Sequence, residues 1–269
     1  MVVGICDGRV CIVTGAGRGI GREHSLMLAE QGAKVVVNDI GGEMDGSGRS
    51  TGPAQEVVDE IVAAGGEALV NGDDISTWDG AERLVQQAIA TCGRLDVLIN
   101  NAGILRDRML ANMTEAEWDA VIAVHLKGTF GPARHAAAYW REQTKAGEAV
   151  DGRIINTSSP SGIYGNVGQT NYGAAKAGIA SFTIIAAMEL ARYGVTVNAI
   201  APVAAHPIRR SVVSIPSRKQ HTRKATSPSP GPNSRSASAT RSRAARGPSA
   251  VPPPDPKPPR SAPRPKNDM

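Results

Sequence analysis

Three side chains in the middle of the sequence have the types and spacing needed to take a proton from an alcohol. Lys176 follows Tyr172 by four residues, so on a helix both lie on one face, and Ser159 precedes Tyr172 by thirteen. A free tyrosine, with a pKa near ~10, is a poor base at neutral pH, but a nearby ammonium stabilises phenolate. Ser159 can donate a hydrogen bond to a developing carbonyl oxygen. This pattern predicts Tyr172 as the acid/base of an alcohol–ketone conversion.

A glycine-rich motif supplies a second observation, because Tyr and Lys one turn apart are common on helix surfaces. Thr14–Gly21 (TGAGRGIG) separates a β-rich run from a helical segment. Glycines there let the backbone turn tightly and approach a pyrophosphate, which binds at the helix N-terminus. A glycine-rich turn without a ligand is the alternative, and the context favours the cofactor. The residues expected to bind it are Gly15, Arg18, Gly19, Ile20 and Gly21.

Asp39 indicates which dinucleotide binds. It follows the apolar run Lys34–Asn38, where a carboxylate can accept both ribose hydroxyls and would repel a 2′-phosphate. It therefore favours NAD over NADP. The alternative is a loop aspartate that caps the turn at Gly41.

Two further segments follow strand-like runs. Asp74 and Ile75 are expected near the adenine, although an Asx turn or helix cap would explain Asp74 as well, and Asp73 competes for the role. The second segment is Asn100, Asn101, Ala102 and Gly103. Its small residues allow the chain to pass close to a cofactor, while its amides could simply tie neighbouring strands together.

Alternating strand-like and helix-like segments position all of these residues. We expect strands at Arg9–Thr14, Lys34–Asn38, Glu67–Val70, Leu95–Ile99, Arg153–Thr157 and Val195–Ile200. We expect helices at Ile20–Gln31, 53–64, Trp78–Thr91, 114–144 and Asn171–Tyr193. Repeated β–α–β units predict an α/β fold with a doubly wound parallel sheet, whose ligands bind at the carboxyl ends of the strands. Every motif above lies at such an end or on the following helix.

Charge divides the chain near residue 204. Residues 1–204 hold 16 Lys and Arg against 23 Asp and Glu, a net charge of −7, whereas residues 205–269 hold 14 against 2, a net charge of +12. The second segment contains 14 of the 18 prolines and no Phe, Trp or Tyr. It cannot bury enough apolar surface to offset its ordering entropy. We therefore expect one domain over 1–204 and a disordered basic tail over 205–269.

The cysteines and the N-terminus bear on location. Cys6, Cys11 and Cys92 are odd in number and lack metal-ligand spacing, so neither a disulfide framework nor a metal site is predicted. The N-terminus lacks the basic start and apolar run of a signal peptide. We expect no apolar stretch of about 18 residues, hence no membrane span and a cytoplasmic location.

In this order and spacing, TGxxxGxG, NNAG, the serine and YxxxK resemble the short-chain dehydrogenase/reductase family over residues 9–203. The resemblance implies a Rossmann-type sheet in the order 3-2-1-4-5-6-7, and hydride exchange between NAD(P) and an alcohol or ketone. It implies that Tyr172 and Lys176 also contact the cofactor, and that Ser159 and Tyr172 bind the substrate. It further implies that the turn at Pro202 and Val203 holds the nicotinamide carboxamide.

Four longer stretches are similar to the dehydrogenase part of multifunctional enzyme type 2 and its single-domain bacterial relatives. They are VVVNDIGG, NNAGILRDR, VHLKGTF and TSSPSGIYGNVGQTNYGAAKAG. This group implies oxidation of (3R)-3-hydroxyacyl-CoA, with hydroxysteroids in some members. His125 stands where the wider family has an asparagine in its proton relay, and this group shares the histidine. A catalytic or structural role is one interpretation, and a helix histidine bonded to a backbone carbonyl is the other.

The resemblance stops after residue 204. Residues 205–210 (AHPIRR) match nothing in the family, and no later segment offers a seventh strand or a substrate lid. We therefore expect a Rossmann-type sheet that lacks its last strand. A natural tail is one explanation, and a frameshift near codon 204 is the favoured one. The codons of Ala205-His206-Pro207, read one base later, can encode Arg-Thr-Arg, which suits the carboxamide-binding turn.

The leading hypothesis is an NAD-dependent oxidoreductase acting on a small-molecule alcohol, ketone or acyl-CoA. We expect a homodimer through the long helices near 114–144 and 171–193, and no membrane partner. One alternative is an inactive NAD-binding remnant. Another is polyanion binding through the basic tail, which can neutralise phosphates but has no aromatic ring for base stacking.

Overall fold

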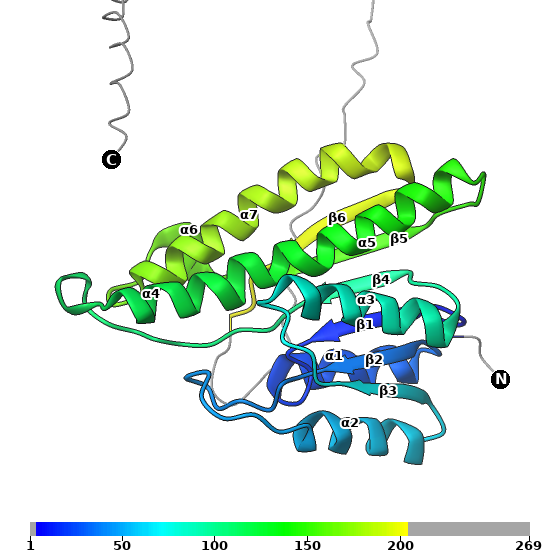
Figure 1. Ribbon diagram of the computed structural model, residues 1–269, viewed down its shortest axis with the longest axis horizontal. Helices are drawn as coiled ribbons and strands as arrows, with labels where there is room; N and C mark the ends of the chain where they lie inside the picture. The colour runs from blue at the N-terminus through cyan, green and yellow to red at the C-terminus, as the bar shows by residue number, and fades with distance from the viewer. Residues whose placement is uncertain (1–3, 204–269) are drawn as a thin grey trace, which may run out of the picture. The chain divides into compact units, whose positions relative to one another are not determined.

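The computed structural model describes residues 4–203, which form a parallel sheet with helices on both faces (Figure 1). The predicted disordered tail, the frameshift boundary near residue 204 and any strand beyond it lie outside the described residues. The expectation of a Rossmann-type α/β fold is confirmed for residues 4–203.

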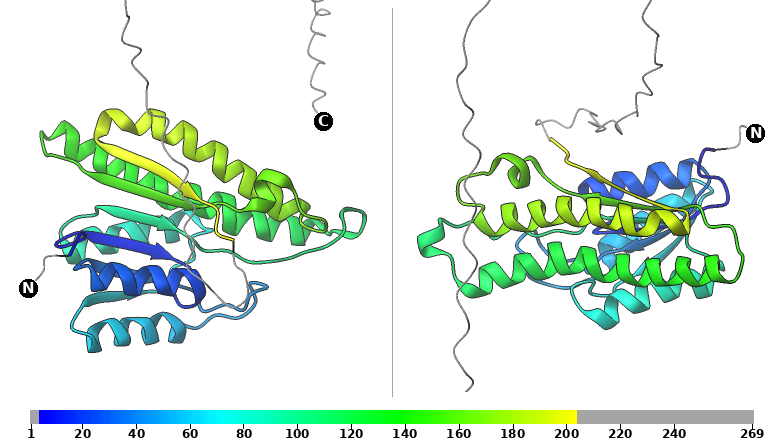
Figure 2. Two further views of the ribbon diagram at one scale, coloured as in Figure 1. Left: turned by 180° about the vertical axis from the view of Figure 1, so that it is seen from behind. Right: turned by 90° about the horizontal axis from the view of Figure 1, so that it is seen from above.

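Six parallel strands form one sheet in the order β3-β2-β1-β4-β5-β6, as Figures 1 and 2 show from three sides. The strands are β1 (Val10–Thr14), β2 (Lys34–Asn38), β3 (Glu67–Asn71), β4 (Val97–Asn100), β5 (Gly152–Thr157) and β6 (Val195–Ile200). Each lies within two residues of its predicted bounds. The strand order reverses between β1 and β4, and this is the switch point beside which such sheets bind ligands.

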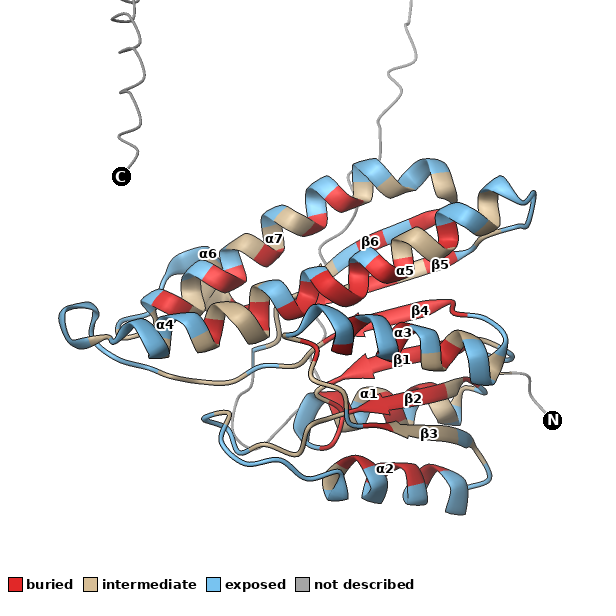
Figure 3. Ribbon diagram, in the orientation of Figure 1, coloured by how far each residue is buried: buried red, intermediate tan, exposed pale blue. Residues whose placement is uncertain are grey.

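One hydrophobic core lies between the sheet and the helices α3 (Trp78–Cys92), α5 (Gly128–Lys145) and α7 (Thr170–Leu190). Trp140 of α5 is its largest fully buried side chain, and its indole N–H donates to the carbonyl of Leu95 at 2.7 Å. Figure 3 shows the buried strands and the exposed outer faces of these helices. This core fixes α7, which carries Tyr172, against the sheet.

The opposite face of the sheet packs on α1 (Gly19–Glu30) and α2 (Gly52–Ala63). Alternate residues of a strand point to opposite faces, so β1 and β2 contribute to both cores and read as continuous apolar runs. β6 differs, because Thr196 and Asn198 on its other face are exposed. Their polarity fits a face that no described helix of residues 4–203 covers.

The expected helix over 114–144 is interrupted. Its first part, α4 (Glu115–Ile122), begins with a capping box, in which the Glu117 N–H donates to Thr114 Oγ1 at 3.2 Å. A π-helical turn, η2 (Ala123–Lys127), then separates α4 from α5. Such turns are frequent at functional sites, and this one carries His125.

Three short elements escaped the sequence prediction. They are α6 (Pro160–Tyr164) and the 3₁₀ turns η1 (Leu110–Asn112) and η3 (Ala191–Tyr193). Elements of three to five residues have no hydrophobic period to detect. The local signal for α6 is Ser159 followed by Pro160, a helix cap followed by the residue favoured at the first helical position.

The expectation that no long apolar stretch exists is wrong. The helical segment Thr170–Tyr193 is long and apolar enough, by length and composition, to cross a membrane, and no other helix within residues 4–203 is. In this structure the segment packs against β5 and β6, and it buries Asn171, Lys176 and Thr183. Ala175, Ile179 and Ala186 are buried on the same helix, so part of its apolar surface covers the sheet.

Candidate active site

Tyr172 and Lys176 lie one turn apart on α7, beside the carboxyl end of β5. The side chain of Lys176 is buried, and its Nζ lies 5.5 Å from the centroid of the Tyr172 ring. The same nitrogen donates to the carbonyl oxygen of Thr157 at 2.6 Å. Burial lowers the pKa of Lys176 to about 8, so the amine still carries its charge at neutral pH. A fixed cation therefore stands next to the tyrosine ring, as the spacing predicted.

Ser159 comes to the same edge of the sheet, two residues after the end of β5. It is buried at the N-cap of α6, and its Oγ accepts the N–H of Ser161 at 3.2 Å. Gly162 packs α6 so closely on α7 that a Cβ there would lie 2.8 Å from the Cβ of Lys176. The Ser159 hydroxyl keeps its proton free for donation, because this bond uses it only as an acceptor.

His125 lies against the tyrosine. Its ring meets that of Tyr172 edge to face, with centroids 5.1 Å apart. Its Nε2 lies 2.8 Å from the carbonyl oxygen of Ile104 and 3.1 Å from the N–H of the same residue. Burial, reinforced by the Lys176 ammonium, lowers the pKa of His125 to about 3. The imidazole is therefore neutral, and its contact with a backbone carbonyl matches the second sequence interpretation.

The glycine motif forms the turn between β1 and α1. A Cβ on Gly21 would lie 2.1 Å from the carbonyl oxygen of Gly15, so this position excludes any side chain. Gly19 has φ +55° and open space around its Cα. No side chain caps the N-terminus of α1, which leaves its first amides available to an anion. These observations fit a bound pyrophosphate.

The two side chains within the motif point outward. Arg18 is exposed, with its Nη1 3.8 Å from Glu43 Oε1, and Ile20 is 40% exposed. Neither takes part in the packing of the turn, so both are accessible to a ligand. Their predicted cofactor contacts stay predictions.

The Asp39 carboxylate accepts a backbone N–H at each of its two oxygens. Its Oδ1 accepts the N–H of Gly41 at 2.7 Å, which is the turn-capping alternative. Its Oδ2 accepts the N–H of Gly17 at 2.8 Å, which ties the carboxylate to the glycine motif. Each carboxylate oxygen can accept a second bond, so these contacts leave capacity for ribose hydroxyls.

Asp74 is occupied within the chain. Its Oδ1 accepts the N–H of Ser76 at 3.0 Å in an Asx turn, and its Oδ2 pairs with Arg49 at 2.6 Å. Burial would raise the pKa of Asp74, but the bonds from Ser76 and Arg49 outweigh it and lower that pKa. Ile75 is buried in the core, and Asp73 pairs with Arg83. The geometry shows the structural alternative for Asp74, and the adenine contact stays a prediction.

The segment after β4 ties strands together. Asn101 Nδ2 donates to the carbonyls of Thr14 and Gly15, and the N–H groups of Asn101 and Ala102 donate to Thr14 Oγ1. Asn100 Nδ2 donates to Asn156 Oδ1 at 2.9 Å, while the buried Asn100 Oδ1 has no protein partner. This segment therefore fastens the glycine motif to the middle of the sheet.

Gly103, Pro202 and Val203 are the remaining residues that the sequence predicts to contact the cofactor. A Cβ on Gly103 would lie 2.4 Å from Cε1 of His125, so this glycine permits the contact between the loop and the helix. Pro202 and Val203 follow β6, and Val203 is 61% exposed. Their neighbours beyond residue 203 lie outside the described residues, so the carboxamide contact stays a prediction.

Sequence reasoning missed Asn171 and Thr14 as individual site residues. Asn171 is fully buried next to Tyr172, and Thr14 accepts two amide N–H groups from the segment after β4. For Thr14, the available signal was a polar residue at the last position of an apolar strand. Asn171 gave no signal beyond its place before the tyrosine.

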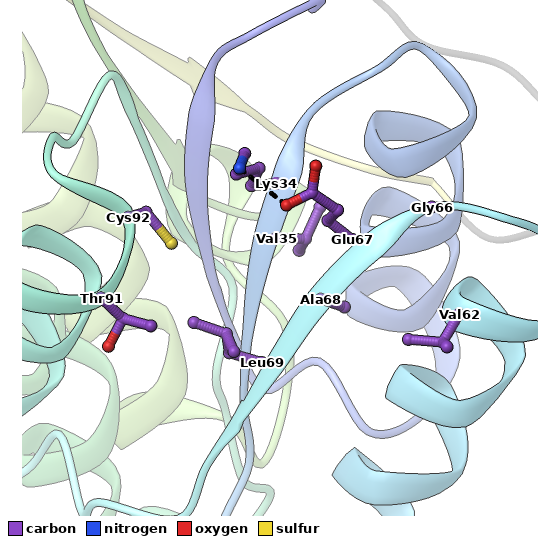
Figure 4. Close-up of a pocket in the computed structure, with 9 residues that line it drawn as sticks. All are labelled: Lys34, Val35, Val62, Gly66, Glu67, Ala68, Leu69, Thr91 and Cys92. Carbon is purple, nitrogen blue, oxygen red and sulfur yellow. Dashed lines mark ion pairs between the residues drawn. The ribbon is translucent and has the colours of Figure 1, made fainter.

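A pocket of about 280 Å³ lies at the opposite edge of the sheet (Figure 4). It is lined by Lys34 and Glu67, which begin β2 and β3, and by Cys92 at the end of α3. Lys34 and Glu67 form an ion pair at 2.7 Å. Because the catalytic candidates lie at the carboxyl ends of the strands, this pocket is separate from them.

Comparison with known proteins identifies the group to which this geometry belongs. The family model described as short chain dehydrogenase matches residues 9–207. Hydroxyacyl-CoA dehydrogenase ChsB1 of Mycobacterium tuberculosis is 51% identical over 202 residues, 73% of this chain and 61% of that protein. Peroxisomal multifunctional enzyme type 2 of Drosophila melanogaster is 50% identical over 207 residues, 77% of this chain and 33% of that protein. The chain thus spans less than two thirds of either relative.

A solved structure, a short chain dehydrogenase from Mycobacterium avium, superposes with a TM-score of 0.70 and 66% identity. The match covers 74% of this chain and 70% of the other. These relatives favour an oxidoreductase over both the inactive remnant and the polyanion-binding alternative.

Proposed function

The chain belongs to the short-chain dehydrogenase family, and on that premise we propose that it transfers hydride between NAD and the 3-hydroxyl carbon of a (3R)-3-hydroxyacyl-CoA. A hydroxysteroid is the second substrate class. The name of the ChsB1 relative supports the acyl-CoA assignment. The main observation that supports the proposed acid/base role of Tyr172 is the buried Lys176 ammonium, which lies 5.5 Å from the centre of the Tyr172 ring.

In the proposed reaction Tyr172 takes the proton of the substrate hydroxyl. The Lys176 ammonium stabilises the phenolate that this requires, and the bond to Thr157 keeps it in place. Ser159 donates a hydrogen bond to the substrate oxygen as it becomes a carbonyl. NAD, when bound, supplies the hydride acceptor. His125 holds the loop at Ile104 and stays neutral, so it adds no charge beside the phenolate.

The proposed cofactor site uses the motifs at the carboxyl ends of β1, β2 and β4. The uncapped N-terminus of α1 binds the pyrophosphate, and Asp39 accepts the ribose hydroxyls. Lys176 and Tyr172 contact the nicotinamide half. The remaining proposed contacts are Gly15, Arg18, Gly19, Ile20, Gly21, Asp74, Ile75, Asn100, Asn101, Ala102, Gly103, Pro202 and Val203.

The test is reduction of NAD by the purified chain with (3R)-3-hydroxyacyl-CoA, its (3S) isomer and a 17β-hydroxysteroid. We expect turnover with the (3R) isomer and its loss in Tyr172→Phe. Tyr193→Phe, in η3 beyond the far end of α7, is the matched control and should retain the rate. Equal rates for the wild-type chain and Tyr172→Phe would overturn the mechanism. A preference for the steroid would assign a hydroxysteroid as the substrate in place of the acyl-CoA.

The expected homodimer belongs to this proposal. A hollow of about 590 Å³ lies between α5 and α7 over Ile154 of β5, and Phe130, Ala137 and Phe182 line it. Ile184 and Met188 on α7 are exposed by 64% and 69%. We expect Ala137→Glu, which places a charge in this hollow, to convert a dimer to a monomer in sedimentation velocity. A wild-type monomer would contradict the assignment.

The origin of residues 205–269 is a separate proposal. A frameshift near codon 204 explains why a family match over residues 9–207 is followed by a Pro- and Arg-rich sequence. Resequencing the gene across this codon tests it. A reading frame without an insertion or deletion relative to close relatives would refute it.

A further inference from the structure

Asn171, the residue before Tyr172, is fully buried, and its amide reaches three segments of the chain. Its Nδ2 donates to the carbonyl oxygen of Arg106 at 3.0 Å and to that of Glu117 at 3.2 Å. Its Oδ1 accepts the backbone N–H of Tyr172 at 2.8 Å. Both donor hydrogens and the acceptor of the primary amide are therefore in use.

The bond to Tyr172 replaces a missing helix cap. The first N–H groups of a helix have no partner within the helix, and Gln169 at the N-cap of α7 makes no side-chain capping bond. Asn171 supplies an acceptor from within the first turn. The turn that carries the tyrosine is therefore held by a side chain that is itself fully buried.

One donated bond fastens this turn to the loop after β4, and the other fastens it to α4. Arg106 lies two residues beyond Ile104, which contacts His125, and Glu117 lies in α4. Parallel bonds join the same segments, including Gln169 Nε2 to Asp107 Oδ2 at 2.8 Å, but these are exposed. An exposed bond is readily exchanged for one to water, whereas a bond donated by the fully buried Asn171 amide is not.

We propose that Asn171 is a positioning residue for Tyr172, which fixes the tyrosine relative to Lys176 and to the loop at Arg106. The inference rests on the proposed function of Tyr172. Displacing a reacting group by about 1 Å can cost on the order of 100-fold in rate, so a lost anchor should affect turnover more than binding.

The test compares three variants at this position. Asn171→Asp keeps the shape but replaces the amide nitrogen, which donates both bonds, with an oxygen that faces two carbonyls, and Asn171→Ala removes all three bonds. Asn171→Ser keeps a small hydroxyl and serves if the other two fail to fold. Asn112→Asp makes the same amide-to-carboxylate change on an exposed residue and is the matched control.

We expect kcat to fall at least ~10-fold in Asn171→Asp and Asn171→Ala, while the Kd for NADH stays within about twofold. The pH profile of kcat should also shift, because the acid/base has moved, and that of Asn112→Asp should overlay the wild type. A fall in kcat of less than about twofold would overturn the proposal. A parallel loss of NADH binding in every folded variant would also overturn it, since this indicates a structural role only.

If the wild-type chain shows no turnover, the proposed function fails and hydrogen exchange of the NADH-bound chain decides this inference separately. Faster amide hydrogen exchange in Asn171→Ala, confined to residues 104–108 and 170–173, would support the positioning role of Asn171. Unchanged exchange, or a uniform increase, would refute it.

Discussion

The ring of His125 stands perpendicular to the ring of Tyr172, with an angle of 88° between the planes and 5.1 Å between the centroids. An edge-to-face pair of this kind fixes one ring against the other. The imidazole is itself held at Nε2 by the backbone of Ile104. The tyrosine is thus bounded on one side by a neutral ring and on another by the Lys176 cation.

Replacing Lys176 tests the role of that cation. Lys176→Met keeps the apolar stem and removes the ammonium, so the phenolate loses its stabilising charge. We expect kcat to fall by ~10²–10⁴-fold, measured as NAD reduction under saturating substrate. Lys34→Met removes a lysine at the opposite edge of the sheet and should leave kcat unchanged. A Lys176→Met rate close to that of the wild type would exclude the electrostatic role.

Acidification should destabilise the fold through His125. Its pKa falls from 6.5 to about 3 on folding because of burial, so between these values the unfolded chain binds a proton that the folded chain does not. Stability therefore rises with pH across this window and is lost as pH falls below 6.5. At about pH 4.5 the loss is roughly 2–3 kcal/mol relative to about pH 7.

Urea unfolding of the chain and of His125→Asn at both pH values measures this contribution. His24 and His135, whose pKa values are also lowered by burial, are present in both proteins and cancel in the comparison. We expect a smaller pH dependence in His125→Asn. An identical pH dependence in the two proteins would show that His125 does not titrate differently on folding.

Gly103 should be intolerant of a side chain because of His125. In Gly103→Ala the new Cβ would lie 2.4 Å from Cε1 of the ring, so we expect the free energy of unfolding to fall by about 1–3 kcal/mol. In a His125→Ala background the clash is absent and the penalty should shrink. Chemical denaturation of the four proteins of this double-mutant cycle provides the measurement. Additive penalties would mean that the two residues do not interact.

Asp39 should decide between the two nicotinamide dinucleotides. Asp39→Asn removes the charge that repels a 2′-phosphate, so the affinity for NADPH relative to NADH should rise at least ~10-fold in fluorescence titrations. Asp45→Asn, an exposed carboxylate on the same loop, is the control. If the affinity for NADPH relative to NADH is unchanged in Asp39→Asn, the carboxylate does not determine cofactor selectivity. Its role would then be to cap the turn, where it accepts the N–H of Gly41.

Much of the fold could be predicted because its signals are local. Uninterrupted β-branched runs such as Lys34–Asn38 place strands, glycines end helices, and the Thr114–Glu117 pair marks a helix start. The π-turn at His125 could not be predicted, because a single inserted residue leaves the helical period almost unchanged. Likewise, the apolar length of α7 is the same for a helix that covers a sheet and one that spans a membrane.

The sequence by itself determined which side chains can do chemistry, because residue type and a fixed helical spacing suffice to place Tyr172 and Lys176 on one face. Only the tertiary structure decided what surrounds them. Residues far apart in the chain supply the carbonyl of Thr157 to the lysine, the ring of His125 to the tyrosine and the carbonyl of Arg106 to Asn171. Such contacts depend on burial and strand order, which bring together groups that have no sequence relationship.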